Sequence, residues 1–133
     1  MATPRLRSPM RSPLGRAIGL GSAKEGVGHW WAQRITALAL VPLAVWFVVA
    51  IVELAGADRA AVVEWVREPL PAVLLVLLLI ATFYHGALGL QVVIEDYVEN
   101  ETLRLGLLIA MRLLAFVFVV RGVLAVIKLS LGA

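Results

Sequence analysis

The sequence predicts an all-α membrane protein: a bundle of three transmembrane helices that cross up, down and up, with the N-terminus inside. Two observations from composition support this class. Of the 133 residues, 62% are hydrophobic, and the mean hydropathy is +0.95, whereas soluble domains are about half apolar. A third observation is that the apolar residues form three stretches, each long enough to cross a ~30 Å hydrocarbon core. The chain has no cysteine, which excludes disulfides and thiolate metal sites.

Residues 1–28 are predicted to form a basic arm on the inner side, and residues 29–133 the membrane anchor. The arm is rich in Arg, Ser, Pro and Gly and contains one acidic residue, Glu25. Its Arg and Ser content is also typical of a mitochondrial transit peptide, but it has no amphipathic period and continues directly into the first span. We therefore favour an uncleaved arm on a multi-pass protein of a bacterial inner membrane over a mitochondrial inner membrane protein.

The three spans are expected at about residues 32–54, 70–98 and 102–129. The first has one ionisable residue before its last turn, Arg34, and Pro42 within it predicts a bend because proline removes a backbone hydrogen bond. The polar connector at 56–68 allows a short interfacial helix. Pro69 and Pro71 then open the second span, where a missing N–H donor does no harm. Short connections between the spans predict antiparallel neighbours.

The distribution of Lys and Arg predicts the orientation, because the inner ends of spans carry the excess of these residues. The side of the arm carries Arg5, Arg7, Arg11, Arg16, Lys24, Arg34 and Arg104. The opposite side carries Arg59, Arg67 and Lys128. The N-terminus is therefore predicted to lie inside, and the end of the second span, with Asp96 and Tyr97, faces the same side.

One histidine is predicted to lie deep in the membrane. His85 follows Pro71 by 14 residues and precedes Asp96 by 11, which is about 21 Å and 16 Å along a helix. An ionisable group at that depth is costly without a partner and suggests a function, yet a neutral histidine hydrogen-bonded to a neighbouring helix fits as well. Small residues beside it, Gly86 and Gly89, leave room for a flat haem or simply for close helix packing.

Other polar groups of the predicted spans leave similar alternatives. The Tyr97 hydroxyl could donate a hydrogen bond to a carbonyl that arrives from the lipid, with Asp96 orienting it or relaying protons. Tyrosine is equally common as an interfacial anchor, and an aspartate at a helix end is often only solvated. Arg112 and Arg121 lie on opposite faces of the third span and are expected to seek partners or to reach the interface.

Two segments together resemble a known family. They are residues 84–98 (YHGALGLQVVIEDYV) and residues 29–37 (HWWAQRITA). Both are similar to the small hydrophobic membrane-anchor subunit, of the type that carries haem b, of succinate dehydrogenase, which is respiratory complex II. The resemblance covers the chain from about residue 21 onward, and it is poorer in the third span, where it assigns no role to Arg112 or Arg121.

The resemblance implies a role for each candidate residue. His85 would be one axial ligand of a haem b iron, and a second anchor subunit would supply the other histidine. Tyr97 would hydrogen-bond the carbonyl of ubiquinone with support from Asp96. Arg34 and His29 would lie near the haem propionates or the quinone entrance.

The resemblance also implies an activity and partners. The chain would be a non-flavin membrane subunit of a succinate:ubiquinone oxidoreductase, inactive alone. Its partners would be a flavoprotein subunit, an iron–sulfur subunit, the second haem-ligating anchor and membrane lipid, but not nucleic acid. A fumarate reductase anchor is one alternative. A non-redox scaffold or transporter subunit, in which His85 and the arginines form structural hydrogen bonds, is another.

Overall fold

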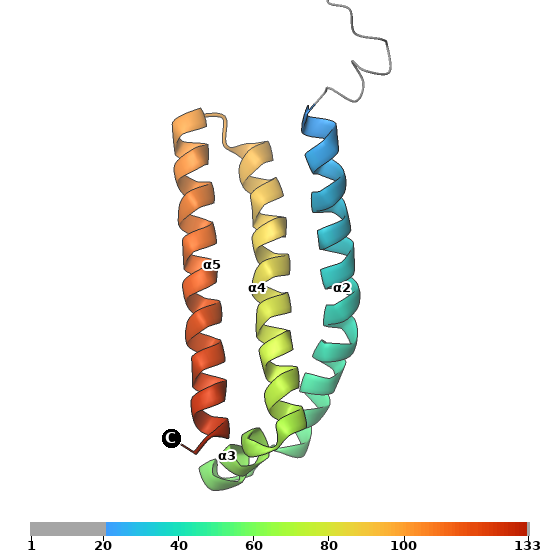
Figure 1. Ribbon diagram of the computed structural model, residues 1–133, viewed down its shortest axis with the longest axis vertical. Coiled ribbons are helices and arrows are strands. Elements are labelled where there is room, and N and C mark those ends of the chain that lie inside the picture. The colour runs from blue at the N-terminus through green and yellow to red at the C-terminus, as the bar shows by residue number, and fades with distance from the viewer. Residues whose placement is uncertain (1–20, 133) are drawn as a thin grey trace, which may run out of the picture. The chain divides into compact units, whose positions relative to one another are not determined.

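The computed structural model describes residues 21–132 of the chain, and all of its regular structure there is helical (Figure 1). The chain divides into two compact units, Met1–Trp31 and Ala32–Ala133. Helix α2, Gly21–Glu53, contains the boundary between them. The second unit also holds α3, Arg59–Arg67, α4, Pro69–Tyr97, and α5, Glu101–Ser130. Three of these helices, α2, α4 and α5, are long and apolar enough to cross a membrane. The predicted class, an all-α protein with three membrane-spanning helices, is confirmed.

The bounds of the last two long helices agree with the predicted spans to within one residue at each end. Helix α2 differs, because it begins at Gly21 and not near residue 32. No proline interrupts the sequence between Pro13 and Pro42, so the helical hydrogen bonds can continue outward past the apolar stretch. Of the predicted arm, residues 1–20 lie outside the described part, and residues 21–28 form the first turns of α2.

Local signals in the sequence set the remaining helix ends. The Asp58 side chain accepts a hydrogen bond from the Ala61 amide at 2.8 Å and caps α3, the short helix that the connector allows. Pro69 stands in the first turn of α4, where no amide donor is needed. The Asn100 side chain caps α5 by accepting from the Leu103 amide at 3.0 Å. Each cap satisfies an amide that would otherwise lack a partner.

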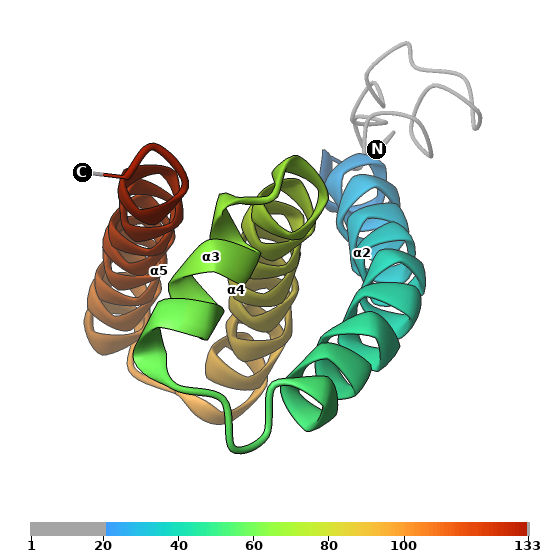
Figure 2. The same cartoon turned by 90° about the horizontal axis from the view of Figure 1, so that it is seen from below.

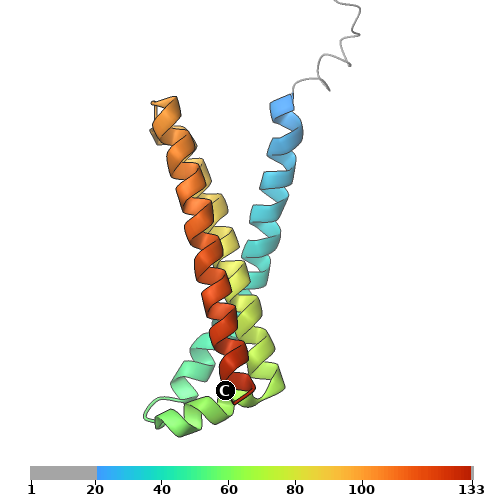
Figure 3. The ribbon, with the colours of Figure 1, turned by 60° about the vertical axis from the view of Figure 1, so that its left-hand side comes forward.

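Within the second unit, α4 lies between α5 and residues 32–53 of α2, and α3 crosses one end (Figures 1 and 2). Thr36 of α2 lies beside His85 of α4, and Trp46, further along α2, stacks on Trp65 of α3 with ring centroids 5.8 Å apart. Gln33 of α2 lies beside Gly89 of α4, and Thr36 of α2 lies beside His85 of α4, so the two helices run antiparallel. Beyond residue 32 the α2 ribbon curves, with Pro42 inside the helix (Figure 3), as expected of a helix that loses a backbone hydrogen bond.

Helices α4 and α5 also pack as an antiparallel pair. Phe83 stacks on Phe118 with centroids 5.8 Å apart and an interplanar angle of 8°. Toward the α3 end, Gly122 faces Leu79 so closely that a Cβ atom at position 122 would lie 3.0 Å from Leu79 Cδ1. Gly122 thus permits close approach of the two helices, as small residues do in membranes.

Substitution of this glycine gives the first testable expectation. A Gly122→Leu variant should lower the free energy of unfolding by about 1–3 kcal/mol, because a branched side chain overpacks the contact with Leu79. The measurement is thermal or denaturant unfolding of the purified protein in detergent. Gly106→Leu is the matched control, because a Cβ atom there meets nothing within 4 Å. Equal stability of the two variants would contradict the close contact.

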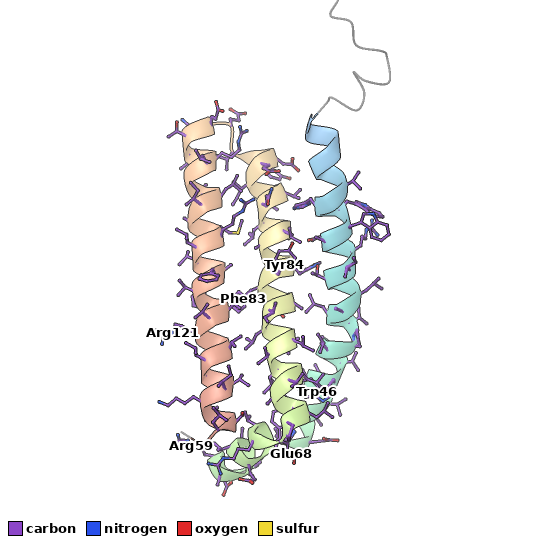
Figure 4. All side chains as sticks on the ribbon, viewed as in Figure 1. Trp46, Arg59, Glu68, Phe83, Tyr84 and Arg121 are labelled. Carbon is purple, nitrogen blue, oxygen red and sulfur yellow. The ribbon has the colours of Figure 1, made fainter. Side chains whose placement is uncertain are left out.

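Very little of this chain is buried within itself. Among the described residues, the buried hydrophobic side chains are Ala50, Val66 and Leu88, and the large apolar side chains point outward along all three long helices (Figure 4). An outer surface of this kind is suited to lipid or to other membrane subunits, not to water.

Candidate functional site

His85 lies in the middle of α4 and is half-buried. Its Nδ1 atom is 2.9 Å from the hydroxyl oxygen of Thr36 on α2. The same hydroxyl lies 2.7 Å from the carbonyl oxygen of Ala32 and 3.1 Å from that of Gln33, the backward hydrogen bonding that threonine commonly adopts inside helices. The histidine is therefore joined to the neighbouring helix through a single side chain.

The two glycines beside His85 have different surroundings. A Cβ atom on Gly86 would meet nothing within 4 Å, whereas one on Gly89 would lie 3.6 Å from the amide nitrogen of Gln33 on α2. Gln33 Oε1 is buried and has no hydrogen-bond partner within residues 21–132. The two glycines therefore differ: Gly86 lines a cavity between α4 and α5, and Gly89 faces α2.

Asp96 and Tyr97 are the last two residues of α4, and both are exposed. The Tyr97 side chain is 81% exposed, so its hydroxyl is accessible to a ligand or to another subunit. Arg34 is exposed on the part of α2 that belongs to the second unit. His29 belongs to the first unit, where it is half-buried, and its Nε2 atom is buried without a hydrogen-bond partner among the described residues.

A hydrogen-bonded chain of polar side chains joins α5 to α4. Arg112 Nη2 donates to Gln91 Oε1 at 2.9 Å, and Gln91 Nε2 donates to Glu95 Oε1 at 2.8 Å. Arg112 thus has the kind of intramembrane partner that the sequence predicts for it, and Glu95 directly precedes Asp96. Arg121 is exposed and points away from α4 (Figure 4).

Sequence reasoning missed the parts played by Thr36 and Gln91. Both stand inside the two segments on which the family resemblance depends, Thr36 two positions after Arg34 and Gln91 six positions after His85. For Gln91, the spacing of four residues to Glu95 is a signal of a helical side-chain pair. No local signal in the sequence predicts that Thr36 contacts His85, because this contact depends on the relative position of two helices along their axes.

Comparison with known proteins decides the family. The profile described as "Succinate dehydrogenase/Fumarate reductase transmembrane subunit" matches residues 8–120. The chain belongs to this family. The resemblance found in residues 29–37 and 84–98 is therefore confirmed. No solved structure matches the chain.

Curated relatives in the family cover nearly the whole chain. The succinate dehydrogenase hydrophobic membrane anchor subunit of Rickettsia bellii (strain RML369-C) is 35% identical over 116 residues, which are 87% of this chain and 93% of the relative. The protein of the same name from Paracoccus denitrificans is 28% identical over 122 residues, 92% of this chain and 94% of its own. With bacterial relatives and three long apolar helices, this member of the family is a multi-pass protein of the bacterial inner membrane.

Proposed function

We propose that this chain is the anchor subunit of a succinate:ubiquinone oxidoreductase, and that it supplies one axial ligand to a haem b and one wall of a ubiquinone site. Membership in the family supports the anchor role. The observation that carries the haem assignment is the half-buried imidazole of His85 in the middle of the membrane-spanning helix α4, whose Nδ1 atom is held by the Thr36 hydroxyl of α2.

The donor set at this position fits haem better than a free metal ion. Within residues 21–132, no three side chains of His, Cys, Asp or Glu gather in a way that could hold a metal ion. A porphyrin brings four nitrogen ligands of its own, so the protein has to provide only axial ligands, for which histidine is common. His85 would provide one ligand, and a histidine of a partner anchor subunit would provide the other.

The bound haem would supply one-electron chemistry, while residues of this chain hold and orient it. His85 would bind the iron. Arg34 and His29 would serve the haem propionates or the quinone entrance, because an arginine pairs well with a carboxylate at a membrane edge.

Reduction of ubiquinone to ubiquinol takes two electrons and two protons, and Asp96 and Tyr97 are suited to the protons. The Tyr97 hydroxyl donates a hydrogen bond to a quinone carbonyl and so holds the ring while negative charge develops on that oxygen. Asp96, next to it and exposed, passes protons from water or orients the tyrosine. The electrons arrive from an iron–sulfur subunit, because a chain with no cysteine offers no thiolate for a cluster.

The charge distribution supports an orientation with the N-terminus inside, so that the chain crosses up, down and up. Asp96 and Tyr97 then meet the inner face, where the flavoprotein and iron–sulfur subunits dock and succinate is oxidised to fumarate. The family description also covers fumarate reductase, so an anchor that serves the reverse reaction is the second candidate.

Co-purification tests this function. Extraction of the tagged chain in mild detergent should yield a flavoprotein, an iron–sulfur protein and a second anchor subunit, with a cytochrome b band after reduction by dithionite. Succinate:quinone activity in that preparation should exceed quinol:fumarate activity. A chain that purifies alone and colourless would refute the proposal, and the opposite ratio of activities would favour fumarate reductase.

A further inference from the structure

Three short contacts around one hydroxyl group restrict where its proton can be. Thr36 Oγ1 lies 2.7 Å from the Ala32 carbonyl oxygen, 3.1 Å from the Gln33 carbonyl oxygen and 2.9 Å from His85 Nδ1. A hydroxyl has one hydrogen to donate and two lone pairs that accept. The two carbonyl oxygens can only accept, and the Ala32 oxygen is the nearest of the three atoms, so the hydroxyl hydrogen points to it.

The remaining contact then has one possible direction. Because the Thr36 hydrogen is engaged with a carbonyl, Thr36 Oγ1 accepts at His85, and His85 Nδ1 carries the proton that is donated. In neutral imidazole one nitrogen carries the proton and the other keeps its lone pair. The lone pair is therefore on Nε2, the nitrogen on the far side of the ring from Thr36.

We infer that Thr36 is a positioning residue for His85, which fixes the tautomer and the ring orientation in which Nε2 can ligate iron. Histidines that ligate metals usually donate the other ring N–H to a fixed acceptor, which also raises the basicity of the ligand. Here the acceptor is a threonine hydroxyl on a different helix, itself held by the backbone of α2. The inference rests on the proposed function, since it concerns the same histidine.

Three variants of the complete complex test the inference. Thr36→Val removes the hydroxyl at almost constant volume, and Thr36→Ser keeps it. Thr82→Val is the control. It removes a hydroxyl on α4, three residues before His85, and this hydroxyl makes no hydrogen bond within the described residues. The readouts are the rate of haem transfer to apomyoglobin, the midpoint potential of haem b, and the electron paramagnetic resonance spectrum of the oxidised haem, which responds to the orientation of axial imidazoles.

Thr36→Val should release haem about tenfold faster, the lower end of what loss of an outer partner costs a metal site. Its midpoint potential should be more positive, because an imidazole without the acceptor donates less charge to oxidised iron, and its resonance spectrum should shift. Thr36→Ser and Thr82→Val should match the wild type in all three readouts. If Thr36→Val does not assemble, Thr36→Ala takes its place with the same expectations.

If Thr36→Val released haem at the wild-type rate and kept the wild-type midpoint potential and resonance spectrum, the inference would be overturned. The proposed function would stay intact. An equal change in Thr82→Val would also overturn it, since the effect would then not belong to the hydroxyl beside His85. A wild-type complex without haem b is a different result, which refutes the haem assignment itself.

Discussion

A His85→Ala variant should assemble with the other subunits but lose the cytochrome b spectrum. The imidazole is the group proposed to bind the iron from this chain, and alanine leaves only one axial ligand, on the partner subunit. Haem affinity should fall by more than the roughly 10- to 100-fold that loss of an outer partner costs. The measurement is the dithionite-reduced minus oxidised spectrum of the purified complex, normalised to flavin.

The other histidine of the chain provides the matched control. His29→Ala removes the same side chain from α2, where the proposal places it near the propionates or the quinone entrance and gives it no bond to the iron, so the cytochrome b band should fall far less than in His85→Ala. A normal band in an intact His85→Ala complex would refute the ligand assignment. In that case the structural alternative, a neutral histidine that links α4 to α2 through Thr36, would account for the hydrogen bond that His85 makes within residues 21–132.

A Tyr97→Phe variant should lower succinate:quinone activity about tenfold while succinate oxidation with a soluble artificial acceptor stays close to normal. The change removes one oxygen atom and hence one hydrogen bond to the quinone carbonyl, which is worth about 1.4 kcal/mol if it forms fully in the transition state. The soluble acceptor takes electrons before they reach the membrane and so reports on the rest of the complex.

Tyr84→Phe is the natural control, because Tyr84 is the only other tyrosine in the chain. It lies on the same helix but 13 residues earlier, about 20 Å from Tyr97 along the axis, and should leave quinone reduction unchanged. A parallel loss of both activities in Tyr97→Phe would indicate a damaged complex and not a quinone contact. An unchanged quinone activity would remove Tyr97 from the site.

The parts of this fold that follow from local chemistry could be predicted from the sequence. Pro69 marks the start of α4 because it lacks an amide donor, and Asn100 marks the start of α5 because its side chain caps an amide there. The bounds of both helices were predicted to within a residue. The start of α2 at Gly21 was not predicted, because the end of an apolar stretch does not end a helix. Hydropathy indicates which residues prefer lipid, whereas a helix continues until a helix-breaking residue ends its hydrogen bonding.

The contacts between helices could not be predicted for a different reason. An α-helix that is apolar on every side has no polar face to fix its rotation, and neighbouring membrane helices can slide without losing hydrophobic burial, because lipid is as apolar as leucine. The pairs Thr36 with His85 and Gln91 with Arg112 depend on that rotation and sliding. The sequence could single out His85 and Arg112 as groups in need of partners, but not the partners.

The scarcity of buried side chains has a consequence for how this protein can change over evolutionary time. A water-soluble core restricts each position to side chains that fill one shape, but here most Val, Leu and Ile side chains face outward. Lipid chains adapt to whichever of these residues is present, so exchanges among them cost little. The constraint falls instead on a few positions, such as Gly122 and the polar pairs. Such freedom fits relatives that align over 87–92% of this chain and are identical at 28–35% of the aligned positions.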